Sequence, residues 1–377
     1  MSWVTLSPVE ERPGHLVCAC DLTPSASAGS FDLDGPSLAV TAGMFALTVL
    51  GQALSTVVLP AAGLVLAPRT GMAVWPYALT LVGAGIATLP AAALTDLFGR
   101  RAALALGASM GLAGGALAAR SFAGGQFFGL ALGAFWLGVA QGFGFFYRHA
   151  GVSGGRDKSR TIAAIMGSGA LAALAAPGIV VLAQSAAGPL APAVALLCAG
   201  AVQVAVLALA IMAMGGGGVR ARIAATSKRK CPIVAATAAA AVAWFGMAAL
   251  MAHAAPNMAL CGVGAAAASG LIASHILSMY APAAIVGPWV ERLGAGKVAA
   301  VGLLAVLCAL VEARRVTTAQ EFEVTMFLAG CGWALTVLGA TLTIHEGGSP
   351  SPRTLALHDG VLFAAAVAGA LTFNFGR

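Results

Sequence analysis

The stretch AALTDLFGRR (92–101) is a short polar loop between two long apolar segments. A second loop of the same kind, GPWVERLGAGK (287–297), lies between two later apolar segments. In each loop a glycine follows an acidic residue by three positions, and the two acids, Asp96 and Glu291, have equivalent places. Internal repeats of this kind are typical of secondary transporters, so the sequence predicts two related halves of a membrane protein.

The composition of the chain indicates a lipid environment. Apolar residues make up 60% of it, charged residues 9%, and the mean hydropathy is +0.93, whereas soluble domains are roughly 25% charged. The net charge of +7 arises in short loops between apolar runs. A membrane surface explains basic residues in such places better than nucleic acid does. We therefore expect membrane lipid as a partner and no nucleic acid.

Eleven segments are long and apolar enough to be spanning helices, which need about 20 residues. They lie near 38–66, 72–94, 102–119, 122–147, 161–184, 188–214, 232–253, 264–290, 298–313, 322–344 and 356–374. With this count, fifteen of the 20 Lys and Arg residues fall on the side that carries the N-terminus. Because basic residues accumulate on the cytoplasmic side, we predict a cytoplasmic N-terminus.

The spans group into domains. Residues 1–37 contain no apolar core long enough for a signal peptide, and we expect them to form a flexible cytoplasmic tail. Residues 38–214 then form a bundle of six helices, and 232–377 form a bundle of five. The glycine-rich and basic stretch 215–231 is predicted to be a cytoplasmic linker between the bundles.

The sequence gives little support to enzymatic or cofactor chemistry. The 7 Cys residues show no paired metal-ligand spacing, and no Gly-Lys-Ser/Thr follows the glycine run at 215–218. No His-Glu-x-x-His motif is found. We expect no metal, no cofactor and no catalytic residues.

The first loop resembles the loop motif of the major facilitator superfamily, Gly-x-Leu-x-Asp-Arg-x-Gly-Arg-Lys/Arg. It matches the motif at Leu94, Asp96, Gly99, Arg100 and Arg101, and departs from it at Ala92 and Leu97. The second loop keeps Gly287, Glu291, Arg292, Gly294 and Lys297. This resemblance, to a bacterial branch of the superfamily, implies an all-α membrane fold of two pseudo-symmetric bundles in the inner membrane. The family has twelve helices, so we expect the twelfth to be missing here.

The resemblance implies a role for the loops as a cytoplasmic gate. Asp96 and Arg100 would latch the two halves together when the transporter opens outward, with Asp359 at the start of the last helix as their neighbour. The alternative is that these charges only set the topology.

The resemblance also implies which helices line a substrate cavity: the first, fourth, seventh and tenth spans. The polar and aromatic candidates on them are Gln52, Ser55, Thr56, Gln141, Trp244, Trp333 and Thr336. The first three share one helix face because their spacing is i, i+3, i+4. Each glutamine or tryptophan could equally be an interhelical contact or an interfacial anchor.

His275 is the one ionisable side chain that we place deep in a span. Such a group is a candidate to bind substrate or carry a proton, and the alternative is a neutral histidine bonded to a neighbouring helix. Proton coupling would run through His275 or a helix-end acid such as Asp359, or be absent.

We therefore predict a secondary active transporter that moves a small organic solute by alternating access, with protons as the candidate coupling ion. A neutral, aromatic cavity suits a neutral or weakly charged solute. The alternative is a transport-inactive relative that acts as a membrane sensor or assembly scaffold.

Overall fold

The computed structural model describes residues 38–146, 148–149, 158–213, 230–254, 258, 265–346, 348 and 350–372. The expected tail at 1–37 and nearly all of the expected linker at 215–231 lie outside the described residues. The described helices belong to one unit of the chain.

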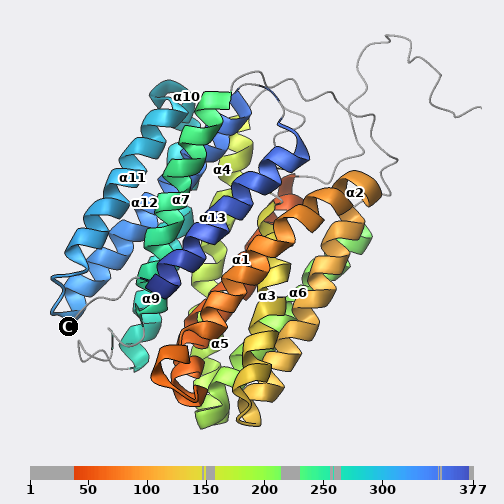
Figure 1. Cartoon of the computed structure of the whole chain (residues 1–377), viewed down its shortest axis with the longest axis vertical. Coiled ribbons are helices and arrows are strands. Elements are labelled where there is room, and N and C mark those ends of the chain that lie inside the picture. The colour runs from red at the N-terminus through yellow and green to blue at the C-terminus, as the bar shows by residue number, and fades with distance from the viewer. Residues whose placement is uncertain are drawn as a thin grey trace, which may run out of the picture. The chain divides into compact units, whose positions relative to one another are not determined.

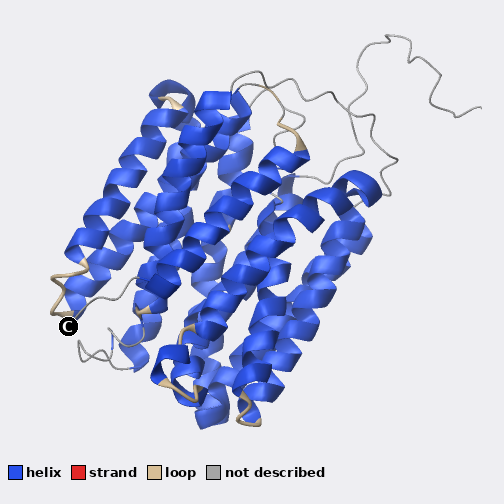
Figure 2. Cartoon of the chain, in the orientation of Figure 1, coloured by secondary structure: helices blue, strands red, loops and turns tan. Residues whose placement is uncertain are grey.

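Every regular element of the described chain is a helix (Figure 2). The long helices are α1 (Leu38–Leu66), α2 (Trp75–Ala123), α3 (Phe127–Phe146), α4 (Lys158–Ser168), α5 (Ala170–Ala187), α6 (Ala191–Ala213), α7 (Lys230–Ala252), α9 (Ala265–Val286), α11 (Ala295–Glu312), α12 (Ala319–Glu346) and α13 (Pro352–Thr372), with a single turn at α10 (Val290–Leu293). Short 3₁₀ turns cover Thr70–Met72, Gly188–Leu190 and Gly287–Trp289. Each of the eleven expected spans coincides with helix, and the all-α prediction is confirmed.

Length and composition support membrane crossing. Eight helical runs in the described chain are long and apolar enough to span a membrane. Two of them, Thr70–Ala123 and Lys158–Met212, contain 54 and 55 residues. At about 1.5 Å per residue, each run exceeds twice the hydrocarbon thickness of about 30 Å. Each therefore holds two crossings.

The two repeated loops share a backbone conformation as well as residues. Gly99 has φ 81° and ψ 168°, and it breaks α2 into two arms. Gly294, the equivalent residue, has φ 87° and ψ 126° between α10 and α11. Residues with a Cβ rarely adopt positive φ, so glycine permits the turn at both places. We refer to the face of the bundle that carries these two turns as the loop face.

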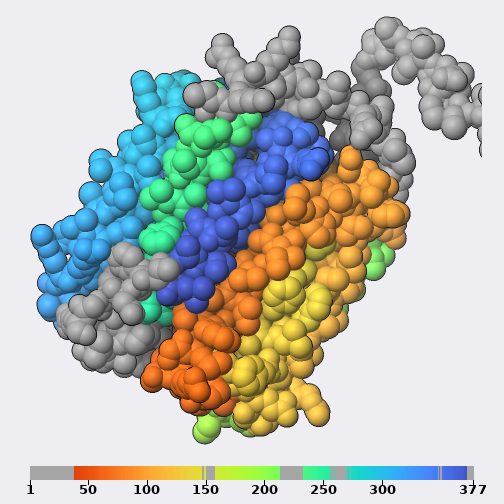
Figure 3. Space-filling model, viewed as in Figure 1, coloured from red at the N-terminus to blue at the C-terminus, as the bar shows by residue number. Residues whose placement is uncertain are grey.

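Several contacts join the helices before residue 214 to those after residue 229. Helix α13 lies between α7 and α2, as Figures 1 and 3 show. Helix α5 packs on α9, and α4 packs on the 3₁₀ turn at 287–289. We call α1–α6 the first set and α7–α13 the second set. Their division into two independent bundles remains a prediction.

Candidate functional site

A cavity lies between three helices of the first set and two of the second, with about 630 Å³ of empty space when the part open to solvent is included. Among its described lining residues there is no Asp, Glu, Lys or Arg. The lining consists of Val49, Gln52, Ala53, Thr56, Val57, Tyr77, Thr80, Leu81, Gln141, Trp244, Met247, Ala248, Met251, His275, Ile276, Met279 and Tyr280. The wall is thus apolar and aromatic, with amide, hydroxyl, indole and imidazole groups as its polar points.

Five of the eight cavity residues expected from the sequence lie in this wall: Gln52, Thr56, Gln141, Trp244 and His275. Ser55 lies behind the wall, fully buried, and accepts a hydrogen bond of 2.9 Å from Gln141 Nε2. Gln52 Oε1 accepts a hydrogen bond of 3.3 Å from the Tyr280 hydroxyl. The cavity wall therefore contains a polar contact between α1 of the first set and α9 of the second.

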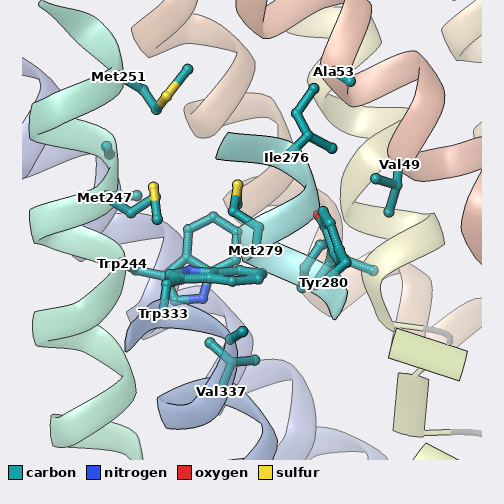
Figure 4. Packing of buried hydrophobic residues seen from close by; sticks show 14 of the residues in the cluster. Val49, Ala53, Trp244, Met247, Met251, Ile276, Met279, Tyr280, Trp333 and Val337 are labelled. Atoms are coloured by element: carbon teal, nitrogen blue, oxygen red, sulfur yellow. The ribbon is translucent and has the colours of Figure 1, made fainter. Parts of the chain in front are cut away.

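An aromatic layer from five helices closes one end of the cavity. It consists of Phe145, Trp244, Tyr280, Trp333 and Phe363, and Figure 4 shows its two indoles against each other. The rings of Trp244 and Trp333 meet edge to face, with centroids 5.2 Å apart and an interplanar angle of 76°. Such packing is favourable beyond the area it buries. Trp333, expected in the cavity wall, is fully buried in this layer instead.

Thr336 is turned away from the cavity, contrary to the sequence prediction. Its hydroxyl donates to the Gly332 carbonyl over 2.7 Å, and the side chain faces the Ala299 carbonyl of α11. The hydroxyl is therefore satisfied within its own helix, at a helix–helix contact. Spacing along α12 could not distinguish this face from the cavity face.

Three buried ring nitrogens in this region have no hydrogen-bond partner among the described residues: Trp244 Nε1, Trp333 Nε1 and His275 Nε2. The tautomer of neutral His275 follows from its other nitrogen, because Nδ1 lies 2.9 Å from the Met326 carbonyl oxygen and must donate to it. Nε2 is then an acceptor, whereas the two indole nitrogens are donors. Unpaired buried polar groups are costly, typically about 1–3 kcal/mol, so these atoms favour a site completed by a ligand.

A second group of polar residues is buried beyond the aromatic layer, toward the loop face. It consists of Arg148, His149, His345, His358 and Asp359, which we call the Arg148–Asp359 cluster. On α12, Trp333, Val337, Thr341 and His345 occupy successive turns, which puts Thr341 about 12 Å from Trp333 along the axis. The cluster and the cavity therefore lie on opposite sides of the aromatic layer.

An ion pair between Arg148 and Asp359 lies at the centre of this cluster. Arg148 donates from Nη2 to Asp359 Oδ1 over 2.5 Å and from Nη1 to Oδ2 over 3.4 Å. His149 Nε2 lies 3.3 Å from Asp359 Oδ1, and His149 Nδ1 lies 3.2 Å from His345 Nε2. On the far side, His358 Nδ1 lies 2.8 Å from the Thr237 hydroxyl of α7. The contacts join the segment between α3 and α4 to α12 and α13.

Burial controls the charge of His149, which lies outside the spanning helices. Removal from water lowers the pKa of His149 below its usual value, and the nearby Asp359 carboxylate opposes this shift only in part. The nearby Arg148 guanidinium lowers the pKa further. His149 is therefore neutral in this closed arrangement at neutral pH.

The residues expected to form the cytoplasmic gate are spread over the loop face. Asp96, Arg101 and Lys297 have exposed side chains. Glu291 accepts a hydrogen bond of 3.0 Å from Ser159 of α4, a contact between the two sets. The guanidinium of Arg292 lies 5.5 Å from the Trp289 ring.

Asp359 has a charge partner that the sequence analysis did not name. Its carboxylate pairs with Arg148, whereas Asp96 is exposed. Asp359 also lies within α13, which begins at Pro352, four residues before the expected start. Besides His275, which was expected deep in a span, all five side chains of the Arg148–Asp359 cluster are buried. The signal missed in the sequence was the set of histidines at the ends of spans.

Comparison with known proteins identifies the fold of the chain. No family model matches the chain. The riboflavin transporter RfnT of Brucella anthropi is 28% identical over 358 residues, covering 87% of each chain. The structure of the human organic anion transporter MFSD10 superposes with a TM-score of 0.67 at 13% identity, covering 89% of this chain and 91% of that one. The chain has the major facilitator superfamily fold. The Escherichia coli fucose:proton symporter FucP shares this fold with a TM-score of 0.61, at 12% identity over 89% of this chain and 90% of that one.

The major facilitator fold expected from the two loops is thus confirmed. A bacterial homologue of the human lysosomal transporter Spinster, in an inward-facing and unoccupied conformation, has the same fold with a TM-score of 0.60. It is 13% identical and covers 89% of this chain and 80% of that one. All of these similar proteins are membrane transporters, and this chain is a multi-pass membrane protein of the same fold.

Proposed function

We propose that this chain is a secondary transporter that carries a small, uncharged organic solute across a bacterial inner membrane by alternating access. One observation carries the proposal: a neutral cavity is shared by helices of both sets and is separated from the loop face by an aromatic layer and a buried ion pair. A binding site between two helix sets, closed on one side, is what alternating access requires.

The directions of the helices support closure at the loop face. Along α7, Trp244, Met247 and Met251 lie at successive steps toward the end opposite the loop face, and the two methionines line the cavity (Figure 4). Tyr77, near the start of α2, lines the same end. The cavity therefore extends away from the loop face, and solute would enter from the other side.

The chemistry of the wall supports a flat aromatic solute with hydrogen-bonding edges. Trp244 and Tyr280 offer ring surfaces, and three methionines add soft, adaptable contacts. The unpaired Trp244 Nε1 and His275 Nε2 supply one donor and one acceptor. Riboflavin, which the relative RfnT is named for transporting, has an uncharged three-ring system with adjacent N–H and carbonyl groups. We propose riboflavin, or a solute of its class, as the substrate.

The test is uptake of radiolabelled riboflavin into liposomes that contain the purified chain, beside protein-free liposomes. We expect saturable uptake that falls at least tenfold in Gln141→Ala. The matched control is Gln203→Ala, because Gln203 is also a buried glutamine but lies on α6, outside the cavity lining. It should transport nearly as the parent does.

Two outcomes would contradict the proposal. Uptake that survives every cavity substitution would place the substrate path elsewhere. Riboflavin that binds to folded protein but never crosses the membrane would favour the alternative of a membrane sensor. Binding is followed separately by the quenching of flavin fluorescence.

A further inference from the structure

We propose that the Arg148–Asp359 cluster is the site at which a coupling proton binds, and that a proton bound there separates the two helix sets at the loop face. The inference rests on the transport function proposed above and names the ion that acts with the solute. It is carried by the geometry of five buried groups that belong to both sets.

The hydrogen bonds of the cluster have a defined direction. Asp359 is a carboxylate because it accepts from Arg148, so His149 Nε2 must donate to it across 3.3 Å. Neutral His149 then has only Nδ1 as an acceptor, and His345 Nε2 must donate to it across 3.2 Å. The chain of donors runs from His345 through His149 to Asp359. Such a chain is a path for one proton.

The transfer balances without any other reactant. A proton from water forms a new N–H bond at His345 Nδ1. The proton on His345 Nε2 then moves to His149 Nδ1, breaking one N–H bond and forming another. His345 is neutral again in its other tautomer, and His149 becomes an imidazolium that still donates to Asp359. The cluster has gained one proton and one positive charge.

The added charge destabilises the closed contact. In the closed state the Arg148 guanidinium and the Asp359 carboxylate balance each other. After protonation, two cations share one carboxylate, and all of them are buried. Burying an uncompensated charge is unfavourable. Separation of α12 and α13 from the segment between α3 and α4 would return the charges to water, so protonation favours an open loop face.

The charged groups around the cluster also disfavour an added positive charge in the closed state. Lys158, at the start of α4, and Arg148 repel positive charge on His345. On α13, His358 lies 3.9 Å from Asp359 Oδ1, and its Nδ1 pairs with Thr237 of α7. Asp359 is the carboxylate in direct contact with this group of bases. A second positive charge therefore has no further carboxylate of the cluster to pair with.

The expected dependence on pH has a definite sign. Burial lowers the pKa of His149 in the closed state, whereas a hydrated histidine titrates near pH 6.5. The open state therefore binds the proton more tightly than the closed state. By linkage, opening becomes more favourable as the pH falls below about 6.5.

The test measures opening without any solute. Nitroxide labels are placed on cysteines at Phe98 and Leu293, two exposed positions on the repeated loops, in a chain whose native cysteines are replaced by alanine. Electron paramagnetic resonance in liposomes gives the distance between the labels at about pH 8 and about pH 5. We expect the longer-distance population to increase at least threefold at the lower pH.

Histidine variants test whether the distance change with pH arises in the Arg148–Asp359 cluster. His149→Gln and His345→Gln keep a side-chain N–H donor but cannot gain a charge, and each should abolish the response to pH. His253→Gln is the matched control, because His253 directly follows α7 at the end remote from the loop face. It should keep the response. Elution of each variant as a single species verifies folding.

Two results would overturn the inference. One is an absent response in the labelled parent chain, and the other is a response that both His149→Gln and His345→Gln retain. Riboflavin uptake is measured in parallel to separate the two proposals. Uptake without a response to pH contradicts the proton site alone. A response to pH without uptake contradicts the proposed solute alone.

Discussion

The buried side chains of Arg148 and Asp359 show how a single contact depends on both of its partners. Their exposed side-chain fractions are 1% and 2%. Neither charge could be placed there alone, since removing one partner of a buried pair leaves an uncompensated charge and commonly costs about 3–5 kcal/mol. Replacing one member of the pair should therefore destabilise the protein more than replacing both members.

Asp359→Asn should lower the free energy of unfolding by about 3–5 kcal/mol, because the Arg148 guanidinium then lies buried beside a neutral amide. Replacing both residues, as Arg148→Met with Asp359→Leu, should recover most of the loss. Thermal unfolding in detergent measures both. Equal losses in the single and double variants would show that the pair contributes by packing and not by charge.

Removing the indole nitrogen of Trp244 tests solute binding separately from protein stability. Trp244→Phe removes an N–H group that has no partner among the described residues. Riboflavin affinity should therefore fall by about tenfold, the effect of one lost hydrogen bond. The matched change Trp136→Phe alters a ring on α3 outside the cavity. Fluorescence titration should show no loss of affinity there, and equal losses in both variants would remove the indole from the proposed site.

At the scale of elements, the repeated loops show why glycine recurs at one offset. Gly99 and Gly294 turn the chain with positive φ, each between two helical arms. A Cβ at either position would meet no atom within 4 Å. Backbone conformation, and not crowding, is therefore the reason for glycine in both loops.

This distinction can be measured with alanine. Gly99→Ala and Gly294→Ala should each destabilise the protein by about 1–2 kcal/mol, the cost of left-handed backbone for an L-residue. Gly296→Ala is the control, because Gly296 also has open space around it but lies in the first turn of α11 and has no positive φ. It should be neutral or stabilising by up to about 1 kcal/mol. A loss of stability in Gly296→Ala equal to that in Gly294→Ala would contradict the role of φ.

At the scale of the whole molecule, several contacts between the two sets would have to change if the loop face opened. They include the Arg148–Asp359 pair, the Ser159–Glu291 hydrogen bond and the packing of α5 on α9. The Gln52–Tyr280 bond lies on the cavity side of the same boundary. Opening of the loop face and closure around the solute are thus parts of one motion in the proposed mechanism.

A covalent lock across this boundary should stop transport. Cysteines at Ser159 and Glu291, whose side chains are 3.0 Å apart, can be joined by a short reducible crosslinker. We expect solute uptake to fall to the level of empty liposomes and to return on reduction. Each single-cysteine variant, treated in the same way, should keep its uptake. Full activity in the crosslinked protein would contradict alternating access at this face.

The sequence by itself determined the membrane class, the eleven helical segments and the two repeated loops with their glycines. These features are local: runs of apolar residues, the length needed to cross a bilayer, and a backbone conformation open to glycine. The major facilitator fold was predicted from the resemblance of the first loop to the motif of that superfamily. Five of the eight expected cavity residues also lie in the wall, because they share faces of helices that meet.

Only the tertiary structure decided the partners of the buried charges. Asp359 pairs with Arg148, 211 positions away, and His149 meets His345 across 196 positions. Packing also turned Thr336 toward α11 and buried Trp333 in the aromatic layer. Periodicity shows which residues share a face of a helix, but it does not show which other helix that face will meet. That choice depends on how all the helices pack together.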